Sequence, residues 1–183
     1  MSESNNIISL CGFSGAGKTI IAEAFAKKHP EYAFVDLDAF IEKKYSQSIS
    51  EIFKSEGEEA FREYEYSALC ELVAKPKKLI VALGGGTLEL KKTRRLAKDK
   101  TLCVYLKCSA EVLAERIAQE NERKKRPLLS GVEDIEKWVK KMLSQREKHY
   151  LECAANQIDT TKWNELLITE SLYRIQSGGT FGR

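Results

Sequence analysis

The chain of 183 residues has little of what would mark a special class of protein. It has no apolar run near the roughly 18–20 residues of a membrane span, and its 5 cysteines lack the spacing of a metal site. The formal net charge of +3 is too small for nucleic acid or an anionic membrane to be the main partner. The first residues, MSESNN, contain no apolar segment of a secretion signal. We therefore expect a cytoplasmic protein with reduced thiols, no nucleic-acid partner and no membrane partner.

What the chain does contain is a regular alternation of short apolar runs and helix-length segments. Apolar residues make up 43% and charged residues 31%, and the length fits a single domain, residues 1–183. Runs of this kind are typical of strands buried on both faces of a parallel sheet. We therefore predict an α/β fold, a three-layer α-β-α arrangement with helices on both sides of the sheet. The predicted strands are 7–11, 32–35, 79–83, 102–106 and, more weakly, 156–159.

A phosphate-binding loop follows the first predicted strand. The segment from Gly12 to Thr19, GFSGAGKT, fits the pattern G-x-x-x-x-G-K-[ST] and leads into an amphipathic helix. Its glycines allow successive backbone N–H groups to point at phosphate oxygens, and the helix adds the positive end of its dipole. Lys18 would reach the β and γ phosphates, and the Thr19 hydroxyl could ligate Mg²⁺. The motif predicts an ATP or GTP site formed by Gly12, Ser14, Gly15, Ala16, Gly17, Lys18, Thr19 and Ile20.

Two aspartates stand at the end of the second predicted strand. Asp36 and Asp38 lie one residue apart, and in an extended segment both side chains would share one face. Ligands of open α/β sheets bind at this end of the strands. One carboxylate could then hold the water shell of the metal, for which Asp36 is the better candidate, while Asp38 meets the acceptor hydroxyl. The alternative for Asp36 is that it only caps the following helix.

Two further segments are unusual. Gly84, Gly85 and Gly86 follow the third predicted strand, which has no aspartate of the Walker B type at its end. Three glycines cost backbone entropy, so we expect backbone N–H groups here to approach a ligand closely. Residues 119–131 are highly charged and contain a proline, which suits a mobile lid better than a core element. Within this lid we expect Lys124 and Lys125 to be solvated.

In this order, the phosphate-binding loop, the D-x-D pair, the segment 57–62 (GEEAFR), the triple glycine and the lid segment 126–129 (RPLL) resemble the shikimate kinases. The similarity runs from about residue 7 to about residue 162. It implies a P-loop kinase fold with a five-stranded parallel sheet in the order 2-3-1-4-5 and a mobile lid. It also implies that ATP and Mg²⁺ are used to phosphorylate the 3-hydroxyl of shikimate, a precursor of the aromatic amino acids.

The resemblance further implies roles for individual residues. Asp38 would bind the shikimate hydroxyls and help to remove a proton, and acceptor-binding helices would span about 38–74. Arg62 would meet the substrate carboxylate, for which the planar guanidinium is well suited. The remaining implied ligands are Arg126 for the transferring phosphoryl group, Arg146 as the second carboxylate ligand, Gly84, Gly85 and Gly86 for the substrate, and Arg116 and Lys162 on the adenine side.

Other interpretations remain open at this point. The chain could be another small-molecule P-loop kinase, such as a gluconate or nucleoside-monophosphate kinase, or a related binding module without catalysis. The triple glycine and the Phe61-Arg62 pair disfavour the first, and the intact lysine and aspartates disfavour the second. We expect a monomer, and we expect Trp138 and Trp163 to serve helix packing rather than ligand binding.

Overall fold

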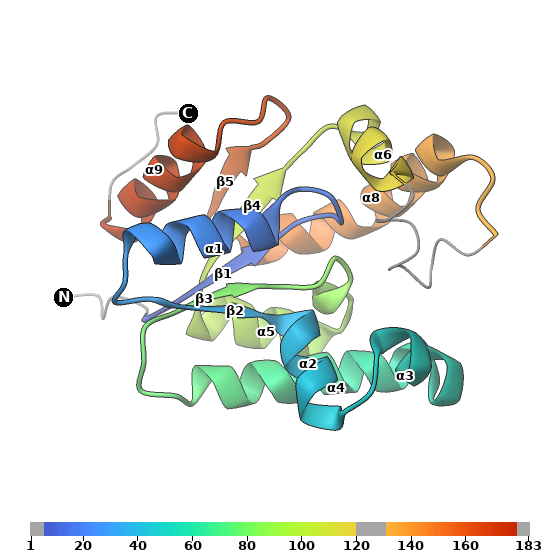
Figure 1. Cartoon of the computed structure of the whole chain (residues 1–183), viewed down its shortest axis with the longest axis horizontal. Helices are drawn as coiled ribbons and strands as arrows, with labels where there is room; N and C mark the ends of the chain where they lie inside the picture. The colour runs from blue at the N-terminus through green and yellow to red at the C-terminus, as the bar shows by residue number, and fades with distance from the viewer. Residues whose placement is uncertain (1–5, 120–130, 179–183) are drawn as a thin grey trace.

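The structure is a computed structural model that describes residues 6–119 and 131–178 (Figure 1). Most of the predicted lid, including Arg126, lies outside the described residues. Among the helices of the described ranges, none is both long and apolar enough to cross a membrane.

Five parallel strands form one sheet in the order β2-β3-β1-β4-β5. This confirms the predicted fold class and the strand order implied by the resemblance. The strand ends differ from the predicted ones by one residue at most. The central strand β1 is completely buried, as its apolar sequence requires. The strands are β1 (Ile7–Cys11), β2 (Ala33–Asp36), β3 (Leu79–Ala82), β4 (Leu102–Lys107) and β5 (Asn156–Asp159).

Helices cover both faces of the sheet, and each face has its own apolar core. Figure 1 shows α1 and α9 on one side of the strands and α4 and α5 on the other. Ser48 and Glu51, spaced as Ser-x-x-Glu, form a capping box at the start of α3. The helices are α1 (Lys18–Lys28), α2 (Leu37–Tyr45), α3 (Ile49–Ser55), α4 (Gly57–Val73), α5 (Lys91–Lys100), α6 (Ala110–Ala118), α8 (Ile135–Cys153), α9 (Glu165–Gln176) and the 3-10 helix η1 (Thr87–Glu89).

Candidate active site

A cleft of about 880 Å³ opens at the carboxyl ends of β1, β2 and β3. Parallel strands place their ligands at this edge. The structure gathers most of the predicted site residues here, although they come from distant parts of the chain. Lining the cleft are Ser14, Gly15, Gly17, Lys18, Thr19, Ile20, Asp36, Asp38, Arg62, Gly84, Gly85, Gly86, Arg116 and Arg146. Of the predicted residues within the described ranges, Gly12, Ala16 and Lys162 do not line it.

The phosphate-binding loop joins β1 to α1. Gly12, Gly15 and Gly17 all have positive φ, which L side chains rarely adopt. A Cβ on Gly12 would also lie 2.5 Å from the carbonyl oxygen of Leu106, so this position requires glycine on two counts. Lys18 begins α1, and its Nζ donates to the carbonyl oxygens of Gly12 and Phe13 at 2.8 and 2.9 Å. The loop thus presents backbone N–H groups and a lysine at a helix N-terminus, the arrangement that binds phosphates.

Asp36 caps the following helix, which was the alternative offered for it, and its role at the metal stays a prediction. Its Oδ1 accepts from the backbone N–H of Ala39 at 3.1 Å and so caps α2. Its Oδ2 accepts from the Thr19 hydroxyl at 2.7 Å. Within the described residues, no group of three or more His, Cys, Asp or Glu side chains could hold a metal ion alone. A hydroxyl and one carboxylate beside a phosphate site fit Mg²⁺, which takes its remaining ligands from phosphates and water.

Asp38 lies in the first turn of α2, so the prediction that both aspartates share an extended segment is wrong. The helix begins directly after Asp36 because that residue caps it. The Oδ1 atom of Asp38 is buried without a hydrogen-bond partner. Burial, and secondarily the charge of Asp36, raises the pKa of Asp38 to about 6, although Lys18 and Arg62 oppose the rise. Such a carboxylate is ionised at neutral pH and has a basicity suited to accepting a proton.

Arg62, on the inner face of α4, is surrounded by carboxylates. Its Nη1 donates to Glu65 and its Nη2 to Glu58, both at 2.6 Å, and its Nε lies 3.3 Å from Glu89. Burial by itself would lower the pKa of Arg62, but the neighbouring carboxylates raise it above its usual value. A Cβ on Gly86 would overlap the guanidinium, so Gly86 provides the space in which Arg62 lies.

Glu65 is a site residue that sequence reasoning missed. Its side chain is completely buried, accepts from Arg62 and from the Thr87 hydroxyl, and lines the cleft. Burial raises the pKa of Glu65 to about 7, although Arg62 and Thr87 favour its ionised form. Gly84 lies beneath it, since a Cβ there would be 2.8 Å from both Glu65 Oε1 and Asp38 Oδ1. The available signal was a glutamate three residues after Arg62 on an otherwise apolar helix face.

The triple glycine therefore makes room first for the protein's own groups. Besides the contacts at Gly84 and Gly86, a Cβ on Gly85 would lie 2.9 Å from the Ser14 hydroxyl oxygen and 3.2 Å from the Ser14 backbone nitrogen. Gly85 thus allows the phosphate-binding loop to pass close to the end of β3. All three glycines also line the cleft, so the predicted backbone contact with a ligand stays a prediction.

Arg146 reaches the same cleft from α8 and is 4% exposed. Its Nε donates to Glu89 at 2.5 Å, and its guanidinium lies over the ring of Phe13. Two arginines from α4 and α8 thus stand on one side of the cleft, joined by a single carboxylate. Planar guanidinium groups of this kind favour a carboxylate ligand.

At the opposite end, Arg116 of α6 packs beside the phosphate-binding loop. It donates to the carbonyl oxygens of Gly15 and Thr160 at 3.0 and 3.1 Å, and its guanidinium lies over the ring of Trp163. Trp163 is not part of a helix, so its predicted role in helix packing is wrong: it lies in the loop before α9 against Gly17. Lys162 in the same loop is exposed.

Trp138 combines both of the roles considered for it. It lies on α8 and packs edge to face against Phe13, with the ring centroids 6.0 Å apart. It also lines the cleft. Trp138 therefore contributes both to helix packing and to the wall of the cleft.

The fold and the cleft define a P-loop phosphotransferase: a phosphate-binding loop, a carboxylate beside Thr19, and a group of polar side chains at the other end of the same cleft. The family model of shikimate kinase matches residues 14–176. The chain belongs to the shikimate kinase family.

Individual relatives agree with this assignment. The chain is 38% identical over 167 residues to a shikimate kinase of Chlorobium chlorochromatii, covering 87% of this chain and 85% of that protein. It is 41% identical over 155 residues to one of Bacillus anthracis, covering 84% and 88%. Its fold resembles that of the Acinetobacter baumannii shikimate kinase in complex with shikimate, with a TM-score of 0.86, 32% identity and coverage of 94% and 93%.

Proposed function

We propose that this chain transfers the γ-phosphoryl group of ATP to the 3-hydroxyl of shikimate, within the biosynthesis of the aromatic amino acids. Membership of the shikimate kinase family supports this reaction. The single observation that carries it is the meeting of Lys18, Asp38 and the pair Arg62 and Arg146 in one cleft. Lys18 suits the phosphate donor and Asp38 suits the reacting hydroxyl. Arg62 and Arg146 suit the carboxylate of the acceptor.

At the phosphate end, the loop 12–19 would bind the triphosphate through backbone N–H groups, with the Lys18 ammonium near the transferred group. Thr19 and Asp36 would hold the metal ion beside it, since their oxygens are already 2.7 Å apart. Bound Mg²⁺ would supply charge that neutralises the β and γ phosphates. We place the adenine near Arg116, which lines the cleft, and Lys162 in the loop beyond it.

At the acceptor end, Asp38 lines the cleft, and its carboxylate would take the proton of the attacking hydroxyl. Arg62 and Arg146 would bind the shikimate carboxylate and so fix which hydroxyl faces Asp38. Gly84, Gly85 and Gly86 would border the ring, since they line the cleft between Asp38 and Arg62.

Further parts of the proposal concern the lid, the domain organisation, the oligomeric state and the compartment. Arg126 would neutralise charge on the transferring phosphoryl group, carried by a lid of residues 119–131 that closes over both substrates. We further propose that the chain works as one domain and as a monomer. The cytoplasm is the expected compartment.

A gluconate or nucleotide kinase is the competing function. The structure also resembles a gluconokinase of Sinorhizobium meliloti, but at 18% identity and a TM-score of 0.57, a likeness in fold alone. An assay that couples ADP release to a detectable reaction should be run with shikimate, gluconate and AMP as acceptors. We expect turnover with shikimate, dependent on Mg²⁺ and abolished in Lys18→Met. Turnover with gluconate or AMP alone would overturn the proposal.

A binding module without catalysis is a different class of function. Calorimetry would then detect nucleotide binding, while no acceptor would support ADP release. The intact set of Lys18, Thr19, Asp36 and Asp38 in the cleft opposes this alternative.

A further inference from the structure

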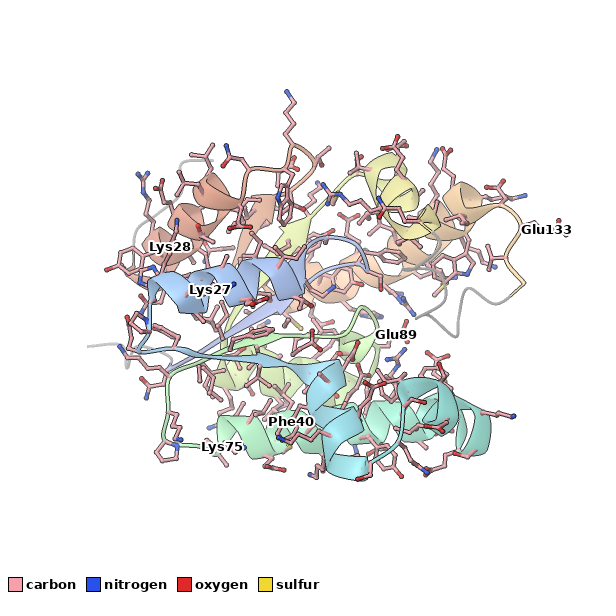
Figure 2. All side chains as sticks on the ribbon, in the orientation of Figure 1. Lys27, Lys28, Phe40, Lys75, Glu89 and Glu133 are labelled. Atoms are coloured by element: carbon pink, nitrogen blue, oxygen red, sulfur yellow. The ribbon has the colours of Figure 1, made fainter. Side chains whose placement is uncertain are left out.

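Glu89 contacts both of the arginines that are proposed to bind the acceptor carboxylate. It is the last residue of η1, directly after the triple glycine. Figure 2 labels Glu89 between the α3–α4 end of the molecule and α8. Its Oε1 accepts from Arg146 Nε at 2.5 Å, and its Oε2 lies 3.3 Å from Arg62 Nε. One internal carboxylate thus bridges the two arginines of the acceptor pocket.

The charges around this bridge leave no positive excess for a substrate. Arg62 and Arg146 contribute two positive charges, against three carboxylates on Glu58, Glu65 and Glu89. Even with Glu65 protonated, the cluster is neutral. A substrate carboxylate that entered without any rearrangement would meet arginines that are already paired, close to a like charge.

Of the three carboxylates, Glu89 is the one suited to leave. The side chain of Glu65 is only 1% exposed and is also held by Thr87, so it stays in place. Glu58 is exposed, and of the two arginines it contacts Arg62. Glu89 is 30% exposed, touches both arginines, and makes a poor contact with Arg62, whose buried Nε has no hydrogen-bond partner.

Arg62 does not need Glu89 to stay in position. Arg62 is held by Glu58 and Glu65 and lies against Gly86. Arg146 is almost fully buried and packs over Phe13. Removal of Glu89 therefore leaves Arg62 supported and frees both guanidinium groups for an acceptor carboxylate, although Arg146 loses its ion pair.

We propose that Glu89 is an internal carboxylate that competes with the acceptor's carboxylate for Arg62 and Arg146, and so sets how tightly and how selectively the acceptor binds. Only an anion that makes better contacts with both arginines displaces it, which favours planar carboxylates held in a fixed orientation. This inference rests on the proposed function, since it takes shikimate as the acceptor.

The test compares Glu89→Gln with the wild type in steady-state kinetics. We expect the KM for shikimate to fall about three- to tenfold, the range of a modest ion-pair competition, with kcat and the KM for ATP little changed. Glu58→Gln is the matched control: it removes a carboxylate from Arg62 alone and should lower the KM less. Glu89→Ala should act in the same direction as Glu89→Gln, and thermal unfolding checks that each variant is folded.

A second acceptor separates competition from a general charge effect. The methyl ester of shikimate has no carboxylate, so Glu89→Gln should not improve its kcat/KM. An unchanged or raised KM for shikimate in Glu89→Gln and Glu89→Ala, or an equal gain with the ester, would overturn the inference while wild-type turnover still supports the proposed function. No wild-type turnover with shikimate would instead refute the proposed function itself.

Discussion

The two ends of the cleft are built in different ways. The phosphate end is a continuous loop whose ligands are mostly backbone N–H groups, with Lys18 and Thr19 at the start of one helix. The acceptor end is made of charged side chains from α2, α4, η1 and α8, and Glu89 joins Arg62 and Arg146 there across long sequence separations. The first is a preformed cradle for one kind of group, whereas the second is a balanced ion network that a substrate must enter.

This difference predicts that the two ends respond to different changes. Backbone geometry should control the nucleotide, and the balance of side-chain charges should control the acceptor. Substitutions at neighbouring positions can therefore have separate effects on the two substrates.

The largest effect is expected from Asp38→Asn, which keeps the size of the side chain but removes its charge. Loss of a general base typically lowers kcat by about 10²–10⁴-fold, and ATP binding should change much less. In the wild type, kcat/KM for shikimate should fall as the pH drops through about 6, because protonated Asp38 cannot accept a proton. In Asp38→Asn, kcat/KM should not fall in this pH range. Lost ATP affinity with normal kcat would instead assign Asp38 to the metal.

Adjacent glycines offer a closer comparison. In Gly86→Ala the new Cβ would overlap the guanidinium of Arg62, so we expect the KM for shikimate to rise about tenfold, as for the loss of one ion-pair contact. In Gly85→Ala the Cβ would press on Ser14 in the phosphate-binding loop, so the KM for ATP should rise instead. Steady-state kinetics with each substrate varied in turn measures both. The same pattern in both variants would mean that the two ends are not separate.

A smaller effect concerns stability. Burial raises the pKa of Glu65 to about 7 in the folded chain, above its usual value of about 4.5, so the folded state keeps this proton to higher pH than the unfolded state. Glu65 therefore costs stability progressively as the pH rises from about 4.5 to above 7. Glu65→Gln removes this cost. The difference between the melting temperatures of the variant and the wild type should therefore grow by roughly 2–6 °C, in favour of the variant, as the pH rises across that range.

The control for this measurement is Glu59→Gln, at an exposed position of the same helix. Its melting temperature should follow that of the wild type at every pH. A constant difference between Glu65→Gln and the wild type would show that Glu65 does not titrate in this range.

The phosphate end could be predicted from the sequence because its determinants are local. Residues 12–19 carry the motif, and the strand before and the helix after it are visible in the apolar pattern. The strands and their alternation with helices followed from the same short-range signals. The structure was needed only to show that Asp36 contacts both Ala39 and Thr19.

The acceptor end could be predicted only in part. The resemblance brought Asp38, Arg62 and Arg146 into the site, but not the carboxylates that hold the arginines. Glu89 meets Arg146 across 57 residues of sequence, a pairing that no local pattern indicates. Trp163 was misassigned for a similar reason, because the loop before α9 reaches Gly17 only in the folded chain.

The most direct test of the difference between the two ends is a calorimetric measurement of ATP and shikimate affinity in Lys18→Met and Arg62→Lys. We predict that Lys18→Met weakens ATP binding and leaves shikimate binding close to wild type. Arg62→Lys should do the reverse, since lysine keeps the charge but loses the planar fork that binds a carboxylate. Loss of both affinities in both folded variants would contradict the account.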